Sequence, residues 1–301
     1  MKQALDVLLA GVVDYAGLFP PAALDMAAAT ESYAQYLADP NRAMLGRFVV
    51  PVVRLREFDD ATSHLLPRGE EKEPWRLSAL PGPDLAADID LALKFNCRHW
   101  SGAEIGHAEI DTLEIKAFIP DEILAATSMM PRQFTPFFEI PISADPIQLV
   151  GAIRRSGAFA KARTGGVTPT AFPSATDVAR FMTRCRDARV AFKLTAGLHH
   201  PMRATYRLTY ASDAPHGVMF GYLNMFVGAA LAWSGADESV VVAALLSESP
   251  SDFGFSDQSL DFGNHSVPTA AVRDARKNFI ISFGSCSFRE PVDELAALSI
   301  S

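Results

Sequence analysis

The stretch TPFFEIPISADPIQLVGAIRRSGAFAKART, residues 135–164, contains one complete unit of the pattern that decides the fold. It begins with an apolar, β-rich run at 135–141 and continues with an amphipathic helical stretch at 145–156. A second apolar run follows at 159–164. A helix between two such runs is typical of a parallel sheet, in which the helix carries the chain back to the start of the neighbouring strand.

The same alternation extends along most of the chain. Strands are predicted at 12–19, 47–53, 75–80, 111–118, 135–141, 159–164, 190–197 and 278–285. Helices are predicted at 22–38, 84–95, 121–129, 145–156, 175–188, 217–234 and 291–298. Eight strands that alternate with helices predict an α/β fold, the (β/α)8 TIM barrel. A doubly wound open sheet is the alternative, which is disfavoured because no GxGxxG motif follows the first strand.

The domain organisation predicted is a single barrel over 1–301, although the length alone also allows two domains. Residues 198–277 form a long link between the last two strands, and we expect an insertion of two helices and a loop. The loop, SDFGFSDQSLDFGNHS (251–266), is expected to cover the barrel mouth. The apolar stretch at 218–233 is too short to cross a bilayer and contains Asn224, so it predicts a helix buried in the core or in a subunit interface.

Composition narrows the class of protein and its partners. The net charge is −8 and no Lys/Arg-rich run is present, which argues against nucleic acid as a partner. The three cysteines form no CxxC pair, so we expect a reducing, cytoplasmic setting without a disulfide framework or structural zinc. The apolar N-terminus is too short for a signal peptide. We therefore expect no membrane contact and no cofactor, and a homo-oligomer remains possible.

Charged residues lie at the carboxyl ends of the predicted strands, where TIM barrels place their active sites. Because alternate residues of a strand face the lumen, one inward-facing set is predicted: Glu114, Lys116, Glu139, Lys161, Arg163 and Lys193. An excess of cations favours an anionic substrate, and close lysines depress one another's pKa. A neutral lysine can attack a carbonyl group and form a Schiff base. A structural ion-pair network lining the barrel is the alternative.

A resemblance to a known family rests on these strands. FAKARTGG (159–166) resembles the strand-six signature of deoxyribose-phosphate aldolase, a class I aldolase barrel, in which Phe-x-Lys-x-x-Thr-Gly carries the Schiff-base lysine. VAFKLTAGL (190–198) is similar to that family's next strand. The resemblance implies that Lys161 forms the imine and that Lys193 lowers its pKa. It also implies that Asp111, within AEIDTLEI, is the catalytic acid, whereas strand parity favours Glu114 and turns Asp111 away from the lumen.

The segment GLHHP (197–201) stands where that family has a glycine pair and an arginine for phosphate, so phosphate recognition is not implied. His199 or His200 is instead a candidate for substrate binding or acid–base chemistry. With Glu139 or Glu114, either histidine is also a candidate metal ligand. The functions left open are an aldolase-type lyase acting on a small anionic carbonyl compound, a metal-dependent hydrolase or lyase, and a non-catalytic small-molecule-binding barrel.

Three further features are candidates for substrate contact. Gly165 and Gly166 precede a helix, and their backbone amides are a potential anion site. Ser285, ahead of the last helix, offers a second such site. Tyr15 ends the first predicted strand and is a candidate acid near the imine.

Overall fold

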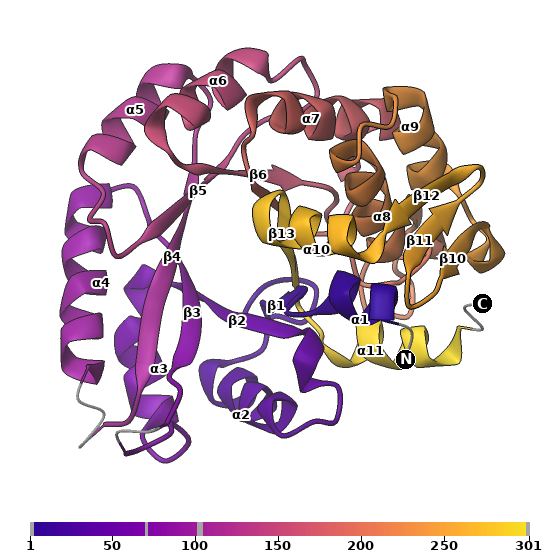
Figure 1. Cartoon of the computed structure of the whole chain (residues 1–301). Helices are drawn as coiled ribbons and strands as arrows, with labels where there is room; N and C mark the ends of the chain where they lie inside the picture. The colour runs from indigo at the N-terminus through magenta and orange to yellow at the C-terminus, as the bar shows by residue number, and fades with distance from the viewer. Residues whose placement is uncertain (1–2, 70–71, 101–104, 299–301) are drawn as a thin grey trace.

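The structure is a computed structural model that describes residues 3–69, 72–100 and 105–298. Eight parallel strands form a closed barrel that surrounds the centre of the molecule in Figure 1. They are β1 (Val13–Tyr15), β2 (Leu45–Pro51), β3 (Trp75–Leu80), β4 (Ala108–Lys116), β5 (Thr135–Glu139), β6 (Phe159–Arg163), β7 (Phe192–Thr195) and β13 (Ile280–Ser285). The ring closes through β1, which pairs with both β2 and β13. The predicted TIM barrel is therefore confirmed.

Helices form the outer layer around this barrel (Figure 1). Those that follow β1 to β6 and β13 are α2 (Met26–Leu37), α3 (Leu55–Thr62), α4 (Leu85–His99), α5 (Pro120–Ser128), α6 (Ile147–Ser156), α7 (Ala175–Ala188) and α11 (Arg289–Ala297). Asp25, Asp84 and Ser174 cap α2, α4 and α7, since each side chain accepts a hydrogen bond from a backbone amide of the first turn. The sequence missed α3 and a helix before the first strand, α1 (Gln3–Leu9).

The link between β7 and β13 is the largest addition to the barrel. It contains β8 (Ala204–Arg207), β9 (His216–Met219), α8 (Tyr222–Trp233), α9 (Glu238–Leu246), β10 (Phe253–Phe255), β11 (Ser259–Phe262), β12 (His265–Pro268) and α10 (Thr269–Asn278). It thus has three helices where two were expected. Short 3-10 turns occur at Arg42–Met44, Val52–Arg54, Pro169–Ala171 and Pro250–Asp252.

The expected loop at 251–266 is largely an antiparallel sheet, β10–β12. The Ala4 amide of α1 donates a hydrogen bond to the Ser256 carbonyl, and the Thr269 amide at the start of α10 bonds to Gln258. The sheet therefore extends the outer layer beside α1 and α10. None of its residues lines the cavity at the mouth described below. The parts of the insertion at the mouth are instead His199 and the β8–β9 hairpin, which contributes Leu208 and Met219 to that cavity.

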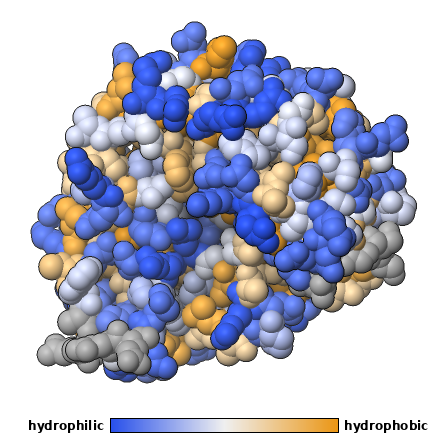
Figure 2. All heavy atoms as spheres, in the orientation of Figure 1, coloured by the Kyte–Doolittle hydropathy of each residue, from blue (hydrophilic) through white to orange (hydrophobic). Residues whose placement is uncertain are grey.

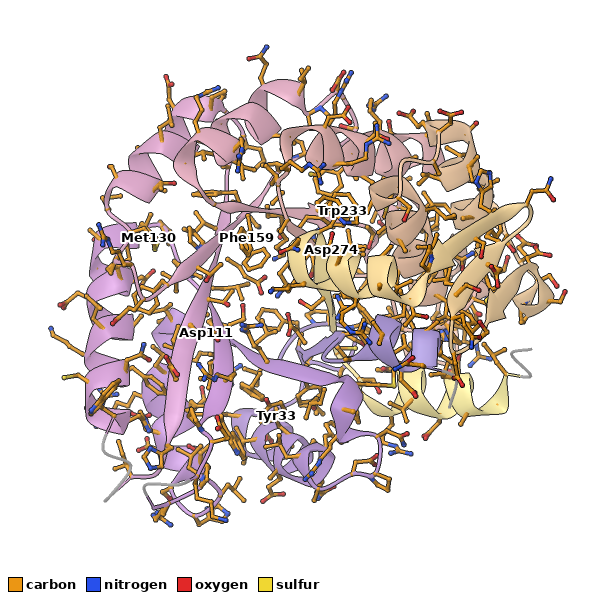
Figure 3. The ribbon with its side chains drawn as sticks, viewed as in Figure 1. Tyr33, Asp111, Met130, Phe159, Trp233 and Asp274 are labelled. Carbon is orange, nitrogen blue, oxygen red and sulfur yellow. The ribbon has the colours of Figure 1, made fainter. Side chains whose placement is uncertain are left out.

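Helix α8 explains the apolar stretch at 218–233. All of its residues from Tyr222 to Ala232 are buried, and the side chain of Asn224 bonds to the backbone at Arg203, Ala244 and Ser247. At the end of α8, the Trp233 indole donates a hydrogen bond to Asp274 of α10. Figure 3 labels these two residues next to each other. No helix within the described residues is long and apolar enough to span a bilayer.

The outer surface viewed in Figure 2 is mostly hydrophilic, as expected where helices cover the apolar side of the barrel strands. Figure 2 shows that hydrophilic residues dominate the viewed face and that apolar residues are scattered among them. The apolar outward side chains of the strands, such as Phe48, Leu77 and Phe192, are instead buried beneath the helices. Strand side chains therefore divide into an apolar layer under the helices and a second set inside the barrel, and the charged residues belong to that second set.

Candidate active site

The side chain of Lys161 lies inside the barrel between two carboxylates. Its Nζ atom is 2.7 Å from Glu114 Oε2 and 2.7 Å from Glu139 Oε2. Parallel pairing places Lys161 of β6 level with Glu139 of β5, and Lys116 of β4 level with Glu139 on its other side. Three neighbouring strands therefore deliver these charges to one layer of the lumen, and the Lys161 side chain is only 5% exposed.

Lys193 of β7 forms the second half of the same cluster. Its Nζ atom is 2.6 Å from Glu114 Oε1 and 2.5 Å from Asp14 Oδ2. Ser282 of β13 donates a hydrogen bond of 2.6 Å to the same oxygen of Asp14, and Ser78 of β3 donates one to Glu114 Oε1. Glu114 thus lies between the two lysines, and both sides of its carboxylate are occupied.

Sequence reasoning missed Asp14 as a member of this cluster. A signal was available, because Asp14 is the one charged residue of the apolar run VVDYAGLF (12–19). Burying an unpaired carboxylate is costly, so a charge in such a strand indicates a partner inside the barrel. With Asp14, the cluster has three carboxylates instead of two. The excess of cations over carboxylates inside the barrel is therefore smaller than the sequence predicted.

Burial and ion pairing shift the pKa values of these groups in opposite directions. Burial raises the pKa of Glu114, but Lys161 and Lys193 outweigh it and hold that pKa well below its usual range. Burial lowers the pKa of Lys193, but Asp14 and Glu114 raise it above its ordinary value. The expectation that adjacent lysines depress one another's pKa is therefore wrong for Lys193, because Glu114 separates the two amines.

A cavity of about 430 Å³ opens beside Lys161. It is at the carboxyl end of the barrel, since the last residues of β3 to β7 line it: Leu80, Lys116, Glu139, Arg163 and Thr195. Glu114 and Lys161 are at its charged floor, while Phe19, Pro20, Pro21, Leu208 and Met219 contribute apolar walls. The amine is thus buried in the protein yet borders a space large enough for a small metabolite.

Asp111 is part of a different cluster. Its carboxylate bonds to Arg47 of β2 at 2.6 Å and lies 3.7 Å from Arg76 of β3, both near the starts of their strands. Figure 3 labels Asp111 on β4. The β3–β4 register shifts at this residue, because Leu77 pairs with Ile110 and Ser78 with Thr112. Strand alternation is therefore interrupted there. Asp111 pairs with Arg47 and Arg76, and it does not line the cavity beside Lys161.

Two of the other predicted contact residues are used for packing. Tyr15 is buried among Tyr33, Tyr36 and Phe48 between β1 and α2, and it does not line the cavity. Ser285 is buried as well, and its hydroxyl accepts a hydrogen bond from the Ser287 amide.

The two glycines after β6 differ in their surroundings. Gly166 lines the cavity. Gly165 packs instead against the backbone of Gly197, since a Cβ atom at Gly165 would lie 2.8 Å from the Gly197 Cα and 2.5 Å from a ring carbon of Phe172. The close approach of the β6 and β7 ends therefore requires glycine at this position.

We expect Gly165→Ala to destabilise the fold by about 1–3 kcal/mol, because the added methyl group forces the two strand ends apart. Gly151→Ala is the matched control. Gly151 is within α6, and a Cβ there meets only the end of the Arg155 side chain at 3.6 Å. Alanine in a helix interior is favoured over glycine by roughly 0.5–1 kcal/mol, so this variant is expected to gain stability. Urea unfolding of both variants measures the contrast, which equal effects would contradict.

The two histidines after β7 bind different glutamates of α11. His199 Nδ1 lies 3.2 Å from Glu290 Oε2, and His200 Nδ1 lies 2.8 Å from Glu294. Each imidazole is thus oriented by a carboxylate, and His199 but not His200 lines the cavity. Within residues 3–69, 72–100 and 105–298, no group of three or more His, Cys, Asp or Glu side chains is placed to hold a metal ion.

The surroundings of His199 predict a pH effect on stability. Burial lowers the pKa of His199, but hydrogen bonds with Cys286 and Glu290 outweigh it and raise the pKa to about 9. A raised pKa in the folded state stabilises the fold fully below the unfolded value of about 6.5, and this contribution disappears as the pH rises through about 9. We expect the difference in unfolding free energy between the wild type and His199→Gln to narrow from pH 6.5 to 9. A constant difference in urea titrations across that range would contradict the assignment.

Together, the fold and the site define a (β/α)8 barrel with a lysine–carboxylate cluster beneath an open cavity at the carboxyl ends of its strands. Comparison with family models, with curated proteins and with solved structures gave no match. The function is therefore argued from the chemistry of this site.

Proposed function

We propose that the protein is an aldolase-type lyase that forms a Schiff base between Lys161 and a small anionic carbonyl compound. The observation that carries the proposal is the position of the Lys161 amine, which contacts two carboxylates and borders a cavity of about 430 Å³. A lysine that served only to pair charges inside the barrel would need no such space. The resemblance of FAKARTGG (159–166) to the aldolase signature supports the same role.

The neighbours of Lys161 account for the proton transfers. An ammonium group must lose a proton before it can attack a carbonyl carbon, and Glu139, which lines the cavity, is placed to accept that proton. The new C–N bond gives a carbinolamine, whose hydroxyl leaves as water when Glu139 returns the proton. The resulting iminium ion accepts the electron pair of the bond between the α and β carbons, which breaks to leave an enamine while Glu139, again a carboxylate, takes the proton of the β-hydroxyl group. The enamine then takes that proton at its α carbon, and water hydrolyses the imine to release the product and free Lys161.

Lys193 and Glu114 have a supporting role in this proposal. Lys193 borders Glu114 and Asp14 rather than the cavity, and its raised pKa keeps it charged. It therefore balances the charge of Glu114 when Lys161 becomes neutral. Glu114 is 2.7 Å from the Lys161 amine, so we assign it to hold that amine toward the cavity. Glu139 thus takes the acid role that strand parity favoured for Glu114 and that the resemblance implied for Asp111, whose carboxylate bonds to Arg47.

Reductive trapping tests the proposal. The purified protein is incubated with a panel of small aldehydes and ketones and treated with borohydride, which reduces an imine to a stable secondary amine. We expect a mass increase that matches one bound compound and a modified peptide that contains Lys161. A sample without borohydride controls for other adducts. Modification spread over surface lysines such as Lys94, with none at Lys161, would refute the Schiff base.

A further inference from the structure

The position where TIM barrels commonly bind phosphate is occupied here by a carboxylate of the protein. That position is commonly formed by the loops after the last two strands and by the N-terminus of a short extra helix, and the first helix after the last strand stands there in this chain. In this chain α11 begins at Arg289 and has Glu290 in its first turn. The Glu290 carboxylate approaches His199 and accepts a hydrogen bond from Tyr210 at 2.9 Å. A phosphate dianion at this point would meet a negative charge at close range.

Of the remaining phosphate candidates, Gly165 and Ser285 are closed. Gly166 lines the cavity, but it contributes a single backbone amide there. Gly165 packs tightly against Gly197 and Phe172, so its backbone is engaged in the contact between strand ends. The Ser285 hydroxyl is buried and accepts a hydrogen bond from Ser287. Neither offers the open set of amides that usually binds a phosphate group.

His199 offers a different kind of anion contact. Its Nδ1 atom faces Glu290 and Cys286, and within the described part of the chain its Nε2 atom has no hydrogen-bond partner. The residue lines the cavity and is otherwise largely buried. With a pKa of about 9 it is charged at neutral pH, so Nε2 presents one charged N–H donor. The other titratable groups around it are Tyr210, which is bonded to Glu290, and His200, whose ring is 6.3 Å away.

We propose that the substrate is not phosphorylated, that it carries a carboxylate, and that His199 binds this carboxylate while the carbonyl group reaches Lys161. The inference rests on the proposed Schiff-base function and narrows its substrate class. Because Leu208 and Met219 line the same cavity, an apolar carbon chain between the two polar ends fits its walls. The substrate class is thus an aldehyde or ketone with a terminal carboxylate.

Three aldehydes separate the possibilities in the trapping experiment: 4-oxobutanoate, the uncharged butanal, and glyceraldehyde 3-phosphate. We expect 4-oxobutanoate to half-saturate Lys161 at a concentration at least about 10-fold lower than either of the others, the effect of one charge-assisted hydrogen bond. His199→Gln should remove this advantage, so that the three aldehydes half-saturate Lys161 at similar concentrations. His200→Gln, which alters the neighbouring ring outside the cavity, should keep it. In the wild type, the advantage should decline as the pH rises through 9.

The outcomes distinguish failure of the substrate class from failure of the Schiff base. Equal half-saturation by the three aldehydes, a preference for the phosphate, or an unchanged preference in His199→Gln would overturn the carboxylate assignment while leaving the imine intact. If no aldehyde modifies Lys161, the Schiff base is wrong, and calorimetry with 4-oxobutanoate then decides the role of His199. Binding that weakens about 10-fold in His199→Gln but not in His200→Gln supports it. Binding that is absent, or equal in the two variants, overturns it.

Discussion

Replacing Lys161 with arginine is expected to abolish borohydride trapping and to lower turnover of any cleaved substrate by at least about 10³-fold, or about 4 kcal/mol of transition-state stabilisation. Arginine keeps the positive charge that Glu114 and Glu139 require, and it cannot form an imine. The cavity beside the amine has room for the longer side chain. The variant should therefore remain folded while it loses covalent chemistry. Mass spectrometry after reduction and urea unfolding measure the two properties separately.

Lys94→Arg is the matched control for this substitution. Lys94 is on the surface of α4, where it pairs with Asp90, and it is 64% exposed. Its replacement should change neither trapping nor stability, because exposed ion pairs contribute only about 0–1 kcal/mol. If Lys161→Arg still yields a reduced adduct elsewhere in the cavity, or turns over substrate at the wild-type rate, Lys161 is a structural ion-pair residue.

The barrel was predictable because its signal is local. The strand at 75–80 has the predicted bounds, because it is a short apolar run. The helix at 175–188 also has the predicted bounds, because it is an amphipathic stretch with a clear N-cap at Ser174. Charged residues in apolar strands likewise identified Lys161, Lys193 and Glu114, because strand alternation places them in the lumen. Local pattern was enough for these three residues, which the structure brings into one cluster.

The other features depend on contacts between distant segments. Asp14 joins Lys193 across 179 positions of the chain, so nothing near it in sequence reveals its partner. Asp111 lies where the pairing register of β3 and β4 shifts, and the alternation of residues in the sequence does not reveal such a shift. The sheet β10–β12 is stabilised where it meets α1 and α10, and its short strands resemble a loop in the sequence. Tyr15 is excluded from the cavity by packing against α2, which also requires the fold.

Glu114→Ala is expected to cost about 3–5 kcal/mol in the free energy of unfolding, because it removes the carboxylate shared by two buried lysines. The loss depends on pH in a defined direction. Lys161 and Lys193 outweigh burial and lower the pKa of Glu114 in the folded state, so its contribution is present above the unfolded value of about 4.3 and decreases as the pH falls below it. Urea unfolding at pH 7 and pH 3.5 should therefore show a smaller difference between wild type and variant at the lower pH.

Glu109→Ala on the same strand provides the control. Glu109 pairs with Arg76 and is 40% exposed, so its loss should cost about 0–1 kcal/mol. A similar small effect for Glu114→Ala would contradict a desolvated cluster and with it the environment proposed for Lys161. A large effect alone does not distinguish a structural network from a catalytic one, since both need the carboxylate. Lys161→Arg makes that distinction, because it preserves the charge while it removes the nucleophile.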